Sequence, residues 1–253
     1  MGLPARAALT LVRVRGCTYR FPMDIILVPG LWLDAASWDA VVPALERAGH
    51  TVHSLTMPGV GVPAPASADI GIADWVDAVV TEIDRCDAPV VLVGHSGGGN
   101  VVWGAADARP DRVQRVIFVD TAPPASGMPI SEFALVDGVV PFPGWDFFDE
   151  PDVYDLDEQT RARTAALMLS VPGKVPTDPL LLRNDARHQV PVTVLAGGLD
   201  AESFTAMLSE WPSSAAEFSA IADAHVVKLG TGHWPQFSKP TELAAAMVEA
   251  LEG

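Results

Sequence analysis

The 253-residue chain has few cysteines, few lysines and no long apolar run, and each scarcity narrows what it can be. Its two cysteines, Cys17 and Cys86, are too few for a disulfide framework and lack the spacing of metal ligands. This cysteine usage predicts free thiols in a reducing cytoplasm. No stretch approaches about twenty uninterrupted apolar residues, so a membrane-spanning helix is not expected. The sequence also contains no phosphate-binding loop, dinucleotide fingerprint or zinc-binding helix motif, which predicts a protein without cofactor or metal.

Positive charge is scarce as well. The chain has 32 acidic and 16 basic residues, for a formal net charge of −16. This balance repels phosphate backbones and anionic lipid surfaces. We therefore expect no nucleic-acid partner and no membrane insertion. Separately, the chain is expected to act on a small molecule and to be a monomer or homodimer. The acidic run Asp146–Glu158 has no regular calcium-ligand loop, which favours a solvated face over a calcium site.

Four arginines interrupt the first 22 residues, which leaves no uncharged core long enough for a secretory signal. Residues 1–22 are therefore expected to form a poorly ordered extension, with the fold beginning at Met23.

Strand-like and helix-like segments alternate along most of the chain, the pattern of a parallel α/β sheet. The expected strands are residues 25–28, 51–55, 90–93, 113–119, 192–196 and 226–229. Between them, residues 122–188 are rich in proline and in aromatics without strand periodicity, which favours a lid over a disordered loop. The sequence therefore predicts a core of residues 23–121 and 189–253 with a lid at 122–188.

A serine stands at the junction of the central strand and the next helix. Residues 94–98 read Gly-His-Ser-Gly-Gly, so that Gly94 and Gly98 flank Ser96 at two positions on either side. Small residues at those positions permit a sharp, strained turn that presents the serine oxygen at the top of the sheet. The strand-turn-helix context makes Ser96 the candidate nucleophile.

This segment resembles the nucleophile elbow of the α/β-hydrolase superfamily, and the resemblance extends over most of residues 24–253. Residues 28–32 (Val-Pro-Gly-Leu-Trp), 37–38 (Ser-Trp) and 48–50 (Ala-Gly-His) resemble its branch of small esterases and hydroxynitrile lyases. The resemblance implies an α/β-hydrolase fold, a Ser-Asp-His order along the chain, and no cofactor.

The histidine and carboxylate partners of Ser96 are expected at the edge of the sheet where the strands end. His233 follows the last strand, where the resemblance places the catalytic base. Asp200 ends a strand and glycine-rich turn at the family position of the acid and is favoured. Asp120, at the end of the preceding strand, is the alternative because some relatives use that edge.

Two backbone amides are expected to form the oxyanion hole: Gly97, just after the nucleophile, and Leu31, in the loop after the first strand. The family's usual His-Gly pair is replaced here by Pro29-Gly30, which keeps backbone donors but removes any histidine contact. The pocket is expected to include the following residues: Trp32, His95, Trp145, Phe148 and Trp234. Trp32 fits a core position equally well.

The favoured function is hydrolysis of a small or medium carboxylic ester through an acyl-enzyme. A hydroxynitrile lyase is disfavoured because Trp234 stands where the resemblance expects lysine. Lactone hydrolysis, carbon–carbon bond hydrolysis and a non-catalytic ligand receptor stay open, since the triad alone does not separate them.

Overall fold

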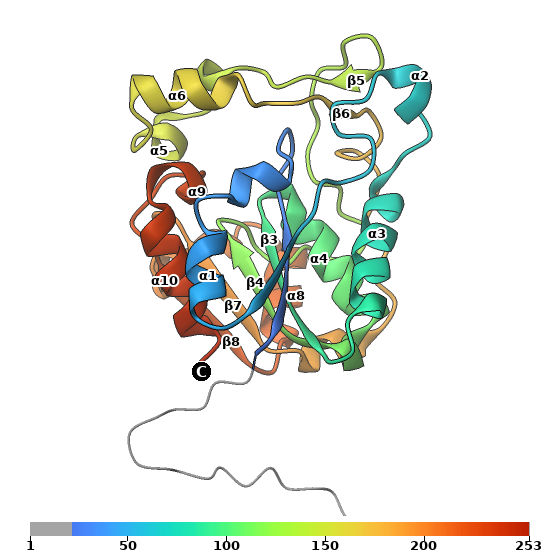
Figure 1. Ribbon diagram of the computed structural model, residues 1–253. Helices are drawn as coiled ribbons and strands as arrows, with labels where there is room; N and C mark the ends of the chain where they lie inside the picture. Colours follow the sequence, from blue (N-terminus) through green and yellow to red (C-terminus); the bar gives the residue numbers. More distant parts are fainter. Residues whose placement is uncertain (1–21, 253) are drawn as a thin grey trace, which may run out of the picture.

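The computed structural model describes residues 22–252 and builds them around a six-stranded parallel sheet (Figure 1). Its strand order is β2-β1-β3-β4-β7-β8. The strands are β1 (Asp24–Val28), β2 (Thr51–Ser54), β3 (Val90–His95), β4 (Val113–Val119), β7 (Val192–Ala196) and β8 (Ala224–Lys228). The predicted α/β fold with a mostly parallel sheet is confirmed. The expected extension at 1–22 lies outside the described residues, apart from Pro22.

Both faces of the sheet are covered, which is why its strands read as continuous apolar runs. Along β1, Ile26 and Val28 join one buried cluster, whereas Ile25 and Leu27 join another on the opposite face. Each such side chain contributes about 1.5–3 kcal/mol when fully buried. The covering helices are α1 (Val42–Arg47) and α10 (Pro240–Ala250) on one face, and α3 (Ile72–Arg85), α4 (Gly97–Ala108), α7 (Ala201–Leu208) and α8 (Pro212–Ala220) on the other. No helix within residues 22–252 is long and apolar enough to cross a bilayer.

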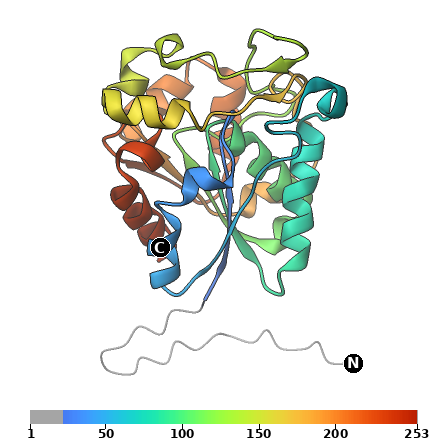
Figure 2. The same ribbon diagram turned by 45° about the horizontal axis from the view of Figure 1, so that its top comes forward.

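The chain between β4 and β7 forms an insertion above the carboxyl ends of the strands (Figures 1 and 2). Its elements are short: β5 (Val139–Val140), α5 (Glu150–Val153), α6 (Glu158–Ala165) and β6 (Val171–Pro172), with 3₁₀ turns at Trp145–Phe147 and Asp185–Gln189. Strands β5 and β6 pair with each other as a separate two-stranded sheet. The other short helices are α2 (Ala64–Ser67), α9 (Pro235–Ser238) and the 3₁₀ turns Ala35–Trp38 and Pro110–Arg112.

A buried ionic cluster fastens the end of this insertion to the core. The Arg187 guanidinium donates to both carboxylate oxygens of Glu217 at 2.8 and 2.9 Å, and to Asp107 at 3.2 Å. Trp103 Nε1 donates to the same Glu217 carboxylate at 2.9 Å. Although burial opposes it, hydrogen bonding by Arg187 and Trp103 holds the pKa of Glu217 below its usual value. The cluster therefore joins the insertion to α4 and α8.

Glu217→Gln is expected to lower the free energy of unfolding by about 3 kcal/mol, because Arg187 would lose the nearer of its two buried carboxylate partners and keep only Asp107. Urea denaturation of wild type and variant measures this loss. Glu210→Gln is the matched control, since Glu210 is exposed. Equal midpoints for all three proteins would contradict a structural role for the cluster.

Candidate active site

The turn from β3 to α4 holds Ser96 in a strained conformation. Ser96 has φ 51° and ψ −126°, a region that side-chain-bearing residues rarely adopt. A Cβ on Gly94 would lie 2.6 Å from the Gly98 carbonyl oxygen, and a Cβ on Gly98 would lie 2.5 Å from that of Pro29. Both glycines are therefore required by close backbone packing around the turn, which is the physical basis of the sequence motif.

His233 meets Ser96 from the loop between β8 and α9. Its Nε2 lies 2.9 Å from the Ser96 Oγ, within hydrogen-bond distance. The insertion holds this loop in place, because the His233 amide donates to the Asp152 carbonyl at 2.7 Å. The Gly232 amide likewise donates to the Asp155 carboxylate at 2.9 Å. The structure thus brings together the two residues on which the sequence prediction rested most.

Asp120, just beyond β4, orients the other side of the His233 ring. Its Oδ2 lies 2.6 Å from His233 Nδ1, and its Oδ1 accepts the Gly197 amide at 2.7 Å. Burial by itself would raise the pKa of Asp120, but hydrogen bonding to His233 and Gly197 keeps it below its usual value. The carboxylate is therefore ionised and accepts a hydrogen bond from the Nδ1–H group, which leaves Nε2 free to accept a hydrogen bond from the Ser96 hydroxyl.

The expectation that Asp200 contacts His233 is wrong. Asp200 is exposed and caps the start of α7, where its carboxylate accepts the Ser203 amide at 2.9 Å. This hydrogen bond lowers the pKa of Asp200. Asp120 and Asp200 follow neighbouring strands, so both reach the same sheet edge. The helix-capping bond turns Asp200 away, and Asp120 occupies the place beside the imidazole.

The loop after β1 lies directly against the serine turn. A Cβ on Gly30 would approach Ser96 Cβ to 3.1 Å, and a Cβ on Gly97 would approach the Leu31 side chain to 3.2 Å. Within residues 22–252, neither the Leu31 nor the Gly97 amide has a hydrogen-bond acceptor. Two backbone donors next to the serine suit an oxyanion.

The sequence predicts that His95 faces the substrate pocket. In the structure it instead supports the loop that carries His233. The side chain is buried, its Nε2 lies 2.7 Å from the His233 carbonyl oxygen, and Gln236 approaches its Nδ1 at 3.3 Å. Because a carbonyl only accepts, Nε2 carries the proton. Burial and the nearby His233 lower the pKa of His95 to about 3, so the ring is neutral near pH 7.

Because the neutral His95 ring is buried, the free energy of unfolding should fall in acid. The folded-state pKa of about 3 lies below the ordinary value of 6.5, so below pH 6.5 the unfolded chain binds a proton that the folded chain refuses. Between pH 7.5 and 5, wild type should therefore lose about 2 kcal/mol more unfolding free energy than His95→Gln. Urea titrations across this range measure the difference, and parallel curves for the two proteins would refute it.

The remaining expected pocket residues gather in an aromatic cluster of the insertion and the histidine loop. The Trp234 ring lies edge-on to His233, with ring centroids 4.7 Å apart. It also packs against Phe148 and Trp145, with centroid distances of 4.6 and 4.9 Å. Trp32 is also buried and contacts Phe148 at 5.9 Å. Trp145 and Trp234 lie in the core of this cluster, so they shape the site mainly by packing.

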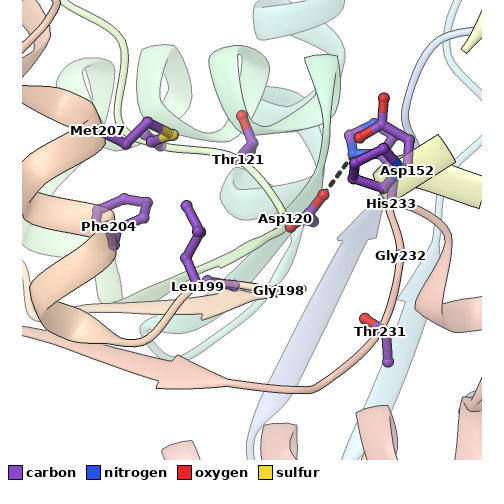
Figure 3. A pocket seen from close by; sticks show the side chains of 13 residues that line it. Asp120, Thr121, Asp152, Gly198, Leu199, Phe204, Met207, Thr231, Gly232 and His233 are labelled. Atoms are coloured by element: carbon purple, nitrogen blue, oxygen red, sulfur yellow. Dashed lines mark hydrogen bonds and ion pairs between the residues drawn. The ribbon is translucent and has the colours of Figure 1, made fainter. Parts of the chain in front are cut away.

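A cavity of about 310 Å³ is lined in part by Asp120 and His233 (Figure 3). Ser96 is not part of its wall. Residues that sequence reasoning did not select line it: Thr121, Asp152, Leu199, Phe204, Met207 and Thr231. Burial raises the pKa of Asp152, whose carboxyl group lies beside His233. The sequence carried only one signal for Asp152, its place in the acidic run that was assigned to a solvated face.

A family model described as "Alpha/beta hydrolase family" matches residues 25–246. The chain belongs to the α/β-hydrolase family. The likeness to solved structures agrees: an extracellular α/β-hydrolase from a Paenibacillus species superposes with a TM-score of 0.71 at 21% identity, over 90% of this chain and 99% of that one. At this level of identity the likeness shows the fold alone.

Named relatives in this family include esterases. The "probable esterase PIR7A" of Oryza sativa subsp. indica is 30% identical over 148 residues, which cover 56% of this chain and 55% of that protein. The chain thus matches about half the length of the rice protein. The "carbendazim hydrolyzing esterase" of a Nocardioides species is 27% identical over 243 residues, 87% of this chain and 96% of that protein.

Proposed function

We propose that this α/β-hydrolase is a serine esterase in which Ser96 is the nucleophile, His233 the base and Asp120 the acid of the triad. One observation carries the proposal: a continuous line of contacts from Ser96 Oγ to His233 (2.9 Å) and on to Asp120 (2.6 Å). The names of the relatives support ester cleavage as the activity.

In the first half-reaction, Ser96 Oγ attacks the ester carbonyl carbon while its proton passes to His233 Nε2. The carbonyl oxygen becomes an oxyanion and accepts hydrogen bonds from the Leu31 and Gly97 amides. Asp120 stabilises the imidazolium that forms. Collapse of the tetrahedral intermediate breaks the bond to the alcohol oxygen, which leaves with the proton from His233.

Water completes the reaction. His233 takes a proton from the water molecule as its oxygen attacks the acyl-enzyme, and a second oxyanion forms at the same two amides. Collapse of this intermediate expels Ser96 Oγ, which recovers a proton from His233, and releases the carboxylic acid. Ester and water are thus the only reactants, and no cofactor enters the balance.

The surroundings of the triad suit small or medium apolar esters, and we assign the insertion the role of a lid. The aromatic cluster at Trp32, Phe148 and Trp234 offers apolar walls beside His233.

Initial rates on p-nitrophenyl esters of increasing acyl length test the proposal, with no metal or cofactor added and Ser96→Ala as the blank. We expect kcat/KM to be highest for short or medium chains and to fall for long ones. No turnover of any ester by folded wild-type protein would reject the esterase and leave the lyase, lactonase and receptor alternatives.

A further inference from the structure

A second cluster of chemically reactive side chains lies at the opposite edge of the sheet from Ser96. Asp24 opens β1, His53 lies in β2, and Cys86 follows the last turn of α3. One ligand atom from each residue lies within 4.8 Å of the other two. Three separate elements thus bring together an oxygen, a nitrogen and a sulfur atom, the donor types that Zn²⁺ accepts.

Both ring nitrogens of His53 face carboxylate oxygens. Its Nδ1 lies 2.9 Å from Glu82 Oε1, and its Nε2 lies 2.9 Å from Asp24 Oδ1. A neutral imidazole has one N–H, so it donates to only one of the two carboxylates. The other nitrogen then directs a lone pair at a carboxylate oxygen. Either a second proton or a cation between the two groups resolves this contact.

Glu82 is placed as an outer partner of a metal-bound histidine. Its carboxylate accepts from His53 Nδ1 at Oε1 and from Arg85 at Oε2, each at 2.9 Å. A carboxylate that accepts from one ring nitrogen fixes the tautomer in which the other nitrogen binds metal. His53 Nε2, facing Asp24, is that other nitrogen.

Cys86 supplies the donor that favours zinc over calcium or magnesium. It is a free, buried cysteine, and within residues 22–252 its thiol donates one hydrogen bond, 3.4 Å long, to the Glu82 carbonyl oxygen.

We propose that Asp24, His53 Nε2 and Cys86 Sγ bind one Zn²⁺ ion, with water as the fourth ligand and Glu82 orienting His53. Zn–S bonds of about 2.3 Å and Zn–N bonds of about 2.0–2.1 Å require small side-chain rotations, because His53 Nε2 and Asp24 Oδ1, 2.9 Å apart, must separate slightly to admit the ion. Binding releases the thiol proton to solvent and changes no oxidation state. The ion would tie β1, β2 and α3 together, far from the triad.

Zinc titration of the full chain, freed of metal with EDTA, tests the site. One equivalent should bind, and at a free zinc concentration about a hundredfold above Kd the Tm should rise by about 5–10 °C. Cobalt substituted for zinc should give a thiolate-to-metal charge-transfer band that Cys86→Ser abolishes. Cys17→Ser is the matched control and should keep both the band and the Tm shift.

Glu82→Gln provides a milder variant should Cys86→Ser or His53→Gln fail to fold. Because it disturbs only the orientation of His53, it should weaken zinc binding about 10- to 100-fold. Unchanged Tm with zinc, or wild-type zinc affinity in Cys86→Ser, overturns the proposal. Ester hydrolysis is not a readout, so this outcome is independent of the proposed function.

Discussion

Replacing Ser96 with alanine is expected to lower kcat for ester hydrolysis by about 10³- to 10⁶-fold. Ser96 Oγ is the hydroxyl that lies 2.9 Å from His233 Nε2, and its strained backbone presents it at the edge where β3 ends. Without the oxygen no acyl-enzyme forms. The Leu31 and Gly97 amides remain in the variant and still favour attack by water, which sets the residual rate. Steady-state kinetics on the preferred ester measure the loss.

Ser131→Ala is the matched control, because Ser131 lies exposed in the insertion. It should keep wild-type kcat and KM. If Ser96→Ala retained more than about a tenth of wild-type kcat while folding normally, Ser96 would not be the nucleophile.

Asp120→Asn is expected to lower kcat about 10⁴-fold with little change in stability. The physical reason is the tautomer of His233. The Gly197 amide donates to Oδ1 of Asp120, so in the variant the asparagine oxygen stays at that position and its NH₂ group faces His233 Nδ1. The ring must then accept at Nδ1 and carry its proton on Nε2, where it cannot take the proton of Ser96. Rates measured at saturating ester give this effect on kcat directly.

Asp200→Asn is the matched variant and should change kcat by no more than a few-fold. Asparagine caps helices about as well as aspartate, so the bond to the Ser203 amide at the start of α7 would be kept. A large loss in Asp200→Asn beside a small one in Asp120→Asn would reverse the assignment of the acid.

The sequence predicts well the positions of Ser96 and His233, because each follows from a pattern at the end of a strand. The β3–Ser96–α4 turn needs small residues at 94 and 98. The contact that requires Gly94 is local, with the Gly98 carbonyl oxygen, whereas Gly98 is required by the distant Pro29 carbonyl, and the motif marks both positions. His233 follows from its place after the last strand, because all parallel strands here end at one edge.

The contact of His233 with Asp120 instead of Asp200 does not follow from the sequence, because strand order alone does not decide between two aspartates at one edge. Asp120 and Asp200 end neighbouring strands, and the difference lies in their hydrogen bonds to Gly197 and Ser203. The second bond was readable, since an aspartate three residues before a serine amide at the start of a helix is an N-cap pattern.

The features that the sequence does not predict depend on contacts between segments that are far apart in the chain. His95 stands next to the nucleophile in sequence, yet its function is set by the His233 carbonyl and Gln236, about 140 positions away. The group at Asp24, His53 and Cys86 shows no ligand spacing along the chain, because each residue comes from a different element. Pairings of this kind depend on how strands and helices dock, which periodicity does not encode.

Labelling with a fluorophosphonate, followed by peptide mass mapping, tests the central claim most directly. The reagent phosphonylates an activated serine, and its phosphonyl oxygen would use the same two amides as the ester oxyanion. The account predicts a single adduct on Ser96, formed rapidly in wild type and much more slowly in Asp120→Asn. An adduct on another residue, or an unlabelled Ser96 in protein that hydrolyses esters, would contradict it.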